Sequence, residues 1–217
     1  MSGGRHILVT GFGPFPGAPY NPTPELVRRL TQLRRPAFAD VALIPYVFDV
    51  SYGAVDRDLP KLLAQHQPHG LLMFGLAQRT RHVRVETRAR NAVTQLWPDA
   101  AHTRVRKRAI AGDSDALTFG PHTLRLLQAA RATGVDARTS RDAGSYLCNY
   151  LSWRAIAACE LENGPTLSAF IHVPLVARPG VQRRKGLPHR ITMDELVDTG
   201  EALLLEMIAA TRRTAFG

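Results

Sequence analysis

The sequence predicts an α/β fold in which a mostly parallel, twisted sheet is covered by helices on both faces. Short apolar runs of strand length alternate with longer amphipathic stretches from one end of the 217 residues to the other. This alternation is typical of parallel sheets, because each return to the same sheet edge needs a crossover helix. No repeat or low-complexity linker interrupts the pattern, so residues 1–217 are expected to form a single domain.

The expected strands are apolar runs bounded by glycine, proline or polar residues. One of them contains Pro45, and because proline cannot donate to a strand ladder, that run is expected at a sheet edge or at a bulge. A short alternating piece at 82–87 indicates a further strand or a hairpin arm. The other strands are expected at residues 6–10, 41–48, 70–74, 135–139 and 167–173.

The expected helices have apolar residues at three- and four-residue spacing. The first should have Asn21 as its N-cap and Pro22 in its first position. The last should start with a capping box of Thr192 and Glu195. The helices are expected at residues 22–33, 50–65, 121–132, 145–160 and 192–213. Residues 92–120 are polar, basic and weakly patterned, which indicates an excursion from the core.

Composition favours a soluble globular protein, since 45% of the residues are hydrophobic and 21% are charged. The N-terminal apolar run is soon broken by glycine and proline, unlike a secretory signal, and no apolar stretch approaches the roughly 20 residues of a membrane span. We therefore expect a cytoplasmic protein without a membrane partner.

The formal net charge of +10 raises the question of a nucleic-acid partner. The basic residues are scattered along the chain, and no helix carries a basic stripe with interleaved aromatic residues. The richest cluster, residues 104–108, lies in the excursion. We expect a solvated basic surface and no nucleic-acid partner.

The two cysteines, Cys148 and Cys159, are expected on one helix, about 16 Å apart along its axis. A disulfide needs Cα atoms within about 7 Å, so two free thiols are expected. No paired or clustered Cys and His residues indicate a metal site.

Cys148 lies in the first turn of its expected helix, directly after a strand and a turn. Unpaired N–H groups and the helix dipole favour an anion there, which activates a thiol as a nucleophile and could stabilise an oxyanion. The alternative is a small buried apolar side chain, the usual role of a cysteine. That alternative is favoured for Cys159, which lies deep in the helix among alanines.

His172 lies near the end of an apolar strand, where an imidazole is costly unless it is hydrogen-bonded. A nucleophilic cysteine needs a base within reach, and the end of a core strand could supply it. A structurally paired histidine is the alternative.

Glu86 alternates with Val83 and Val85, so it could hold the imidazole in the required tautomer. Spacing alone favours a different role, an ion pair with a nearby arginine, because surface pairs of this kind are common. The candidate partners are Arg84, Arg88 and Arg90.

Four ordered blocks of the chain resemble pyroglutamyl peptidase type I, a family of cysteine peptidases. They are ILVTGFGPFPG followed by Asn21–Pro22, GLAQRTRHVRVETRARN, SRDAGSYLCNYLSWRAI and FIHVP. The resemblance implies a three-layer α/β/α sandwich and an omega-peptidase that removes N-terminal pyroglutamate from peptides through a thioester. It also implies that the enzyme needs no cofactor and that it could form a homo-oligomer.

By the same resemblance, Cys148 is the nucleophile, His172 the base and Glu86 the orienting group. Phe12 and Phe15 would line the pocket for the lactam ring, and Asn21 matches a position nearby, although an N-cap role explains it equally well.

Two other readings stay open. The glycines after the first strand suggest a dinucleotide site, but GFGPFPG lacks the G-x-G-x-x-G spacing, and its prolines remove N–H groups that a phosphate needs. The stretch 76–80 lacks the family's usual glycines, which other residues replace at a conformational cost. A catalytically weak or inactive family member that acts as a binding protein is therefore the alternative.

Overall fold

The computed structural model describes residues 4–15, 17–177 and 190–214. Its centre is a six-stranded sheet with the strand order β2-β1-β3-β8-β4-β7. The strands are β1 (Arg5–Phe12), β2 (Val41–Phe48), β3 (Gly70–Leu76), β4 (Val83–Glu86), β7 (Ala137–Ser140) and β8 (Leu167–Val173). Strand β2, which contains Pro45, lies at an edge, as expected.

The first four strands of this order run parallel, which confirms the expected mostly parallel α/β fold. Strand β4 runs antiparallel to β8, however, and β7 runs parallel to β4. The segment from 76 to 83 therefore connects β3 and β4, two antiparallel strands that lie on either side of β8, without a crossover helix. This reversal determines how the candidate site is assembled.

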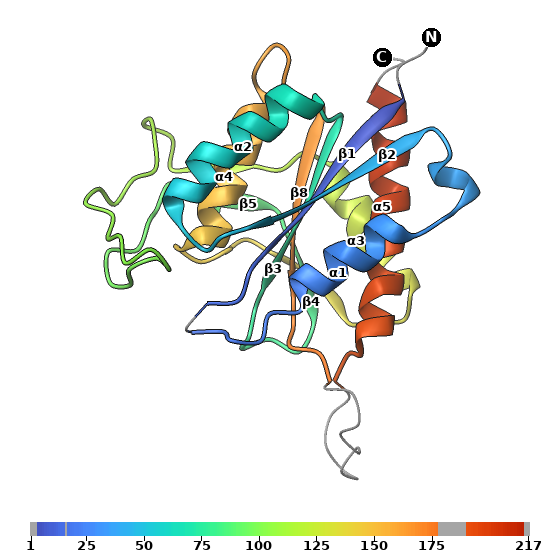
Figure 1. The fold of residues 1–217 in the computed structure, drawn as a ribbon, viewed down its shortest axis with the longest axis horizontal. Coiled ribbons are helices and arrows are strands. Elements are labelled where there is room, and N and C mark those ends of the chain that lie inside the picture. The colour runs from blue at the N-terminus through green and yellow to red at the C-terminus, as the bar shows by residue number, and fades with distance from the viewer. Residues whose placement is uncertain (1–3, 16, 178–189, 215–217) are drawn as a thin grey trace.

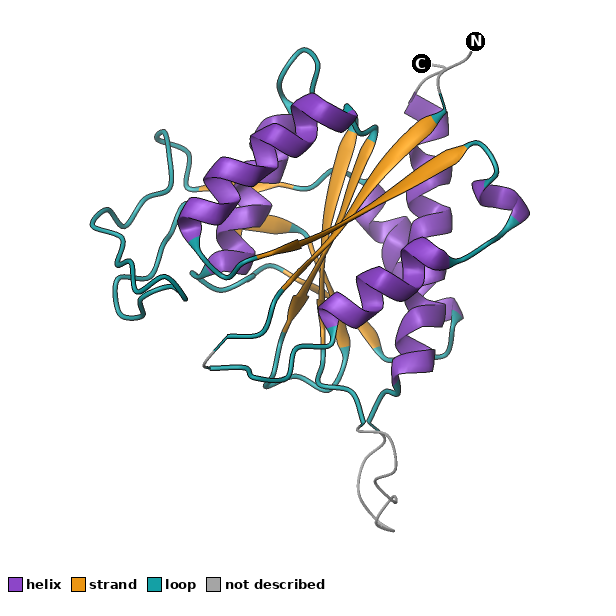
Figure 2. Cartoon of the chain, viewed as in Figure 1, coloured by secondary structure: helices purple, strands orange, loops and turns teal. Residues whose placement is uncertain are grey.

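Helices cover both faces of the sheet and complete the three layers (Figure 2). They are α1 (Thr23–Gln32), α2 (Tyr52–His66), α3 (His122–Ala132), α4 (Leu147–Cys159) and α5 (Met193–Thr214), with a short 3-10 helix at Pro36–Phe38. Helices α1, α3 and α5 lie on one face, and α2 and α4 lie on the other (Figure 1). Among the described helices, none combines the length and the apolar character needed to cross a bilayer.

Alternation along the strands divides the core between the two faces. Ile7 and Val9 pack into the cluster of α1, α3 and α5, whereas Leu8, between them, packs into the cluster of α2 and α4. On β8, Ile171 faces the first cluster and Phe170 the second. Because side chains alternate along a strand, His172, two residues after Phe170, lies on the same face of the sheet as Phe170, the face covered by α2 and α4.

The residues expected to cap α1 and α5 do make hydrogen bonds at the helix starts, but α1 and α4 begin later in the chain than expected. Pro22 occupies the N-cap position of α1, and Asn21 accepts the N–H of Thr23 at 3.1 Å from one residue earlier. The capping box of α5 is confirmed: Thr192 Oγ1 accepts the Glu195 N–H at 3.2 Å, and Glu195 Oε2 accepts the Thr192 N–H at 2.7 Å. Helix α4 starts at Leu147, two residues later than expected.

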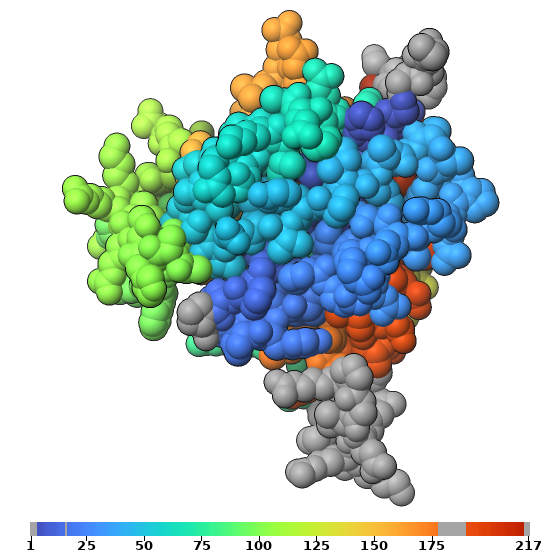
Figure 3. Space-filling model, in the orientation of Figure 1, coloured from blue at the N-terminus to red at the C-terminus, as the bar shows by residue number. Residues whose placement is uncertain are grey.

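A two-stranded antiparallel sheet closes the excursion: β5 (Arg88–Arg90) directly precedes it, and β6 (Ala116–Thr118) lies near its end. Between these strands the chain is irregular and is held by polar side chains. Asn91 Oδ1 accepts the N–H of Ile110 at 2.6 Å, and Asp99, which is 4% exposed, accepts the N–H of Tyr52 at 3.0 Å. The excursion, green in Figure 3, projects from the body of the molecule beside α2.

Candidate active site

The antiparallel direction of β4 places three polar side chains along one face of the sheet. Arg84 pairs directly with His172 in the ladder between β4 and β8. Residues that pair across strands share a face, and so do residues two apart on one strand, so Glu86 lies on this face as well.

Glu86 and His172 form a buried hydrogen-bonded pair. The Nδ1 atom of His172 lies 2.7 Å from Oε1 of Glu86, and the two residues are 4% and 0% exposed. A carboxylate at Nδ1 fixes the imidazole in the tautomer that leaves Nε2 for another partner. The pair thus has the geometry of an oriented general base.

Cys148 supplies that partner from the first turn of α4. A Cβ atom added to Gly75 would lie 2.8 Å from the Cys148 sulfur, so the thiol sits directly on the backbone of β3 at this glycine. Gly75 in turn pairs with His172 in the ladder between β3 and β8. The thiol therefore lies beside the imidazole, and the main chain at position 75 must be glycine to admit it.

The charge state of His172 follows from these neighbours. Burial disfavours the imidazolium, but the charge of Cys148, its hydrogen bond and the Glu86 carboxylate outweigh burial and raise the pKa of His172 to about 9. At neutral pH the protonated ring is favoured, and its charge stabilises a thiolate beside it. The arrangement thus places a cation beside the Cys148 sulfur.

Arg84 adds a second cation to the buried carboxylate. Its guanidinium lies 3.0 Å from Oε1 of Glu86 and also donates to the Ser140 hydroxyl and the Asp142 carbonyl. The sequence left orientation of His172 and an ion pair with arginine as alternatives for Glu86, and the structure shows both contacts together. Oε2 of Glu86 has no hydrogen-bond partner among the described residues.

The other two candidate arginines have different partners. Arg88 donates to the Arg141 carbonyl at 2.8 Å, and Arg90 forms an ion pair with Asp142 at 2.9 Å. Sequence spacing could not show which of the three arginines pairs with Glu86, because the partner depends on how β4 lies in the sheet.

Asn149, which sequence reasoning missed, ties α4 to the segment after Glu86. Its side chain is fully buried, accepts the Arg90 N–H at 2.8 Å, and donates to the carbonyls of Arg90 and Ala92 at 2.8 and 2.9 Å. An amide directly after a cysteine in an otherwise apolar helix was the available signal, since a buried amide needs several partners.

The residues expected to line the pocket lie after β1. Phe12 is 3% exposed and packs against Phe48, while Phe15 is half-buried and stacks on Tyr146 with ring centroids 6.4 Å apart. Asn21 donates to the carbonyl of Phe12 at 2.8 Å, which holds the start of this loop. The loop thus meets α4 two residues before Cys148.

Cys159 occupies the other end of α4, as expected. Burial raises the pKa of its thiol. It borders a separate hollow of about 440 Å³ together with His122 and Arg125. In the described part of the chain, no three His, Cys, Asp or Glu side chains are grouped to hold a metal ion.

Comparisons with known proteins show the family of this chain. The sequence profile of the pyroglutamyl peptidase family, Peptidase_C15, matches residues 5–210. The chain is 28% identical over 171 residues to the pyrrolidone-carboxylate peptidase of Pyrococcus furiosus, covering 78% of this chain and 81% of that protein. It is 29% identical over 181 residues to the Streptococcus suis enzyme of the same name, covering 81% and 82%.

Solved structures share the fold over nearly the whole chain. The pyrrolidone carboxyl peptidase of Thermococcus litoralis superposes with a TM-score of 0.84 at 23% identity, covering 97% of this chain and 96% of that one. Pyroglutamyl peptidase I of Bacillus amyloliquefaciens gives 0.80 at 23% identity, covering 94% and 97%. With a family profile that spans residues 5–210, the chain belongs to the pyroglutamyl peptidase family.

Proposed function

We propose that this protein is a cysteine peptidase that removes an N-terminal pyroglutamyl residue from peptides, with Cys148 as nucleophile, His172 as base and Glu86 as the orienting group. The observation that carries the proposal is the buried 2.7 Å contact of Glu86 with His172, next to a thiol at a helix start. Family membership supplies the substrate class, since the relatives are named as pyrrolidone-carboxylate peptidases.

Cys148 and His172 act in both halves of the reaction, formation of the thioester and its hydrolysis. The Cys148 thiolate attacks the pyroglutamyl carbonyl carbon, and N–H groups of the first turn of α4 stabilise the oxyanion. His172 gives its proton to the leaving amine as the C–N bond breaks, which leaves a thioester. Water then attacks this thioester while His172 accepts a proton, and the thiolate departs.

The pocket assigned to the lactam ring is formed by Phe12 and Phe15, with Asn21 holding the loop that carries them. Pyroglutamate has no α-ammonium group. An apolar pocket therefore accepts its ring and imposes a desolvation cost on a free N-terminal amine.

The stretch 76–80, in which the family's glycines are replaced, is compatible with activity. Among the described non-glycine residues only Gln67 and His102 have positive φ, so the replacements adopt ordinary backbone conformations. Gln78 donates to the Gly17 carbonyl at 2.8 Å, which ties this loop to the loop after β1. This favours an enzyme over a non-catalytic binding protein.

The test is hydrolysis of a pyroglutamyl amide with a chromogenic leaving group by wild type, Cys148→Ala and Cys159→Ala. We expect turnover by wild type, loss of turnover in Cys148→Ala, and most of the activity in Cys159→Ala. Substantial turnover by Cys148→Ala would refute the assignment of the nucleophile, and an inactive wild type that still binds pyroglutamyl peptides would favour the binding protein.

We also propose a homo-oligomer, from the family resemblance, and a cytoplasmic location, from the sequence. Light scattering of the purified protein tests the first, and fractionation of cells tests the second.

A further inference from the structure

Two large apolar side chains project into solvent from the excursion. Leu96 is 77% exposed and Trp97 is 68% exposed, and they are consecutive. Single exposed apolar residues are common, but an adjacent leucine and tryptophan on an irregular loop present a sizeable apolar patch.

Residues 95–97 form an arch, and the residues on either side of it, Thr94 and Pro98, are hydrogen-bonded to the two residues that precede α4. Before it, the Thr94 N–H donates to the Ser145 carbonyl at 2.6 Å. After it, the Pro98 carbonyl accepts the Tyr146 hydroxyl at 3.0 Å. Ser145 and Tyr146 directly precede α4, so the crest of the arch stands close to the first turn that carries Cys148.

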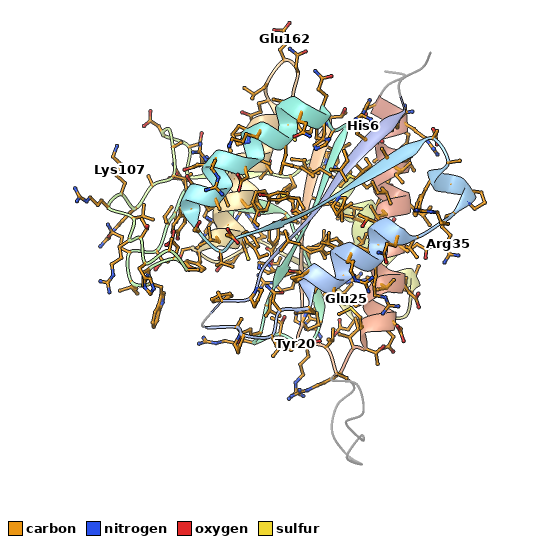
Figure 4. All side chains as sticks on the ribbon, in the orientation of Figure 1. His6, Tyr20, Glu25, Arg35, Lys107 and Glu162 are labelled. Carbon is orange, nitrogen blue, oxygen red and sulfur yellow. The ribbon has the colours of Figure 1, made fainter. Side chains whose placement is uncertain are left out.

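The side chain of Gln95, within the arch, makes two further hydrogen bonds. Gln95 Nε2 donates to the Arg106 carbonyl at 2.6 Å, and Arg108 Nε donates to Gln95 Oε1 at 3.1 Å. The basic segment 104–108 thus braces the arch, and Lys107 stands at the outer edge of this loop (Figure 4). The crest is held in place although its side chains are exposed.

The tyrosine that anchors the arch also touches the pocket assigned to the lactam ring. Tyr146 stacks on Phe15, with ring centroids 6.4 Å apart. Tyr146 therefore lies between the lactam pocket and the arch. Phe15 lies against its ring, and its hydroxyl is hydrogen-bonded to Pro98 at the end of the arch. A substrate whose lactam ring lies by Phe15 would extend its leaving peptide toward the arch.

We propose that Leu96 and Trp97 form the subsite for the residue that follows pyroglutamate, and that the enzyme favours substrates with a large apolar or aromatic residue there. The inference rests on the proposed function and adds a preference on the leaving side. Burying such a side chain against the arch should raise kcat/KM by about ten-fold over glycine, the ratio expected for about 1.5 kcal/mol of apolar burial.

The chain offers a direct optical test. It has two tryptophans, and Trp153 is 4% exposed, so an aqueous quencher such as iodide reports mainly on Trp97. In the Cys148→Ala protein, saturating pyroglutamyl-phenylalanine amide should protect the fluorescence from iodide, whereas saturating pyroglutamyl-glycine amide should protect it much less. The Trp97→Phe protein should lose this protection signal. Equal quenching with both saturating amides would overturn the inference.

Kinetics provide the second test. Trp97→Ala and Leu96→Ala should reduce the preference for the phenylalanyl over the glycyl amide several-fold. The matched control is Leu161→Ala, since Leu161 is 66% exposed and follows the far end of α4, next to Glu162 (Figure 4). A wild type that hydrolyses both amides equally well would overturn this inference alone, whereas failure to hydrolyse either would overturn the proposed function with it.

Discussion

The guanidinium of Arg84 lies 3.0 Å from Oε1 of Glu86, the same oxygen that contacts the ring of His172. The carboxylate is fully buried and its charge needs compensation. When His172 gives up its proton, Arg84 remains as the cation beside Glu86. The contact keeps a cation beside the orienting group through both halves of the proposed reaction.

We therefore expect Arg84→Met to reduce both activity and stability. Removing one partner of a buried carboxylate should lower the free energy of unfolding by about 1–3 kcal/mol. The value of kcat/KM should fall as well, because Glu86 then has no cation beside it once His172 gives up its proton. Urea denaturation and steady-state kinetics measure the two effects. Arg88→Met is the control, because Arg88 donates to a backbone carbonyl instead; equal losses in the two variants would contradict the assignment.

The raised pKa of His172 gives a pH prediction. The ring is protonated up to about pH 9 in the folded protein, whereas an unperturbed histidine has a pKa of about 6.5. A raised pKa stabilises the fold fully below about pH 6.5, and this contribution is lost as the pH rises through about 9. The kcat/KM should fall over the same alkaline range, because the proton for the leaving amine is lost.

A pH–rate profile and NMR titration of the imidazole would check this. In Glu86→Gln the alkaline limb should move to lower pH, since the carboxylate that favours the imidazolium is gone. An unchanged limb in that variant would mean that Glu86 does not act through His172.

The roles assigned to Glu86 and His172 predict which substitution reduces kcat/KM more. His172→Ala removes the group that transfers the proton, a contribution of about 10²–10⁴-fold in rate. Glu86→Gln keeps the shape but removes the charge, and the orienting group transfers no proton itself, so its kcat/KM should fall less. Steady-state kinetics on a pyroglutamyl amide ranks the two variants. A fully active Glu86→Gln would leave Glu86 as an ion-pair partner only.

Gly75 should be more important for activity than its size suggests. A methyl group there would lie 2.6 Å from the ring of Phe170 and 2.8 Å from the Cys148 sulfur. Gly75→Ala should therefore displace the thiol and reduce kcat more than it reduces stability. Slower alkylation of Cys148 by iodoacetamide would report the displacement.

The control for this prediction is Gly53→Ala in α2, where an added Cβ meets nothing within 4 Å. Alanine is favoured over glycine inside a helix by about 1 kcal/mol, so this variant should be slightly more stable and fully active. If Gly75→Ala retained wild-type kcat, the close packing of the thiol on β3 would be catalytically unimportant.

The features that depend on local chemistry could be predicted from the sequence. Apolar runs and helical periodicity predict the strands and helices, and Pro45 predicts that β2 lies at an edge. The turn before Cys148 and the apolar run before His172 predict a thiol at a helix start and an imidazole at a strand end. These signals lie within a few residues of the atoms concerned, so one segment is enough to recognise each.

Which distant groups meet depends on how the whole chain folds. The antiparallel β4 brings both Arg84 and Glu86 to His172, and no local pattern states the direction in which a strand pairs. The excursion follows no periodicity because side chains such as Asn91 and Asp99 hold it by hydrogen bonds to the backbone. Strand pairing and buried polar contacts join segments far apart in the chain, and their free energy depends on geometry that exists only once the chain has folded.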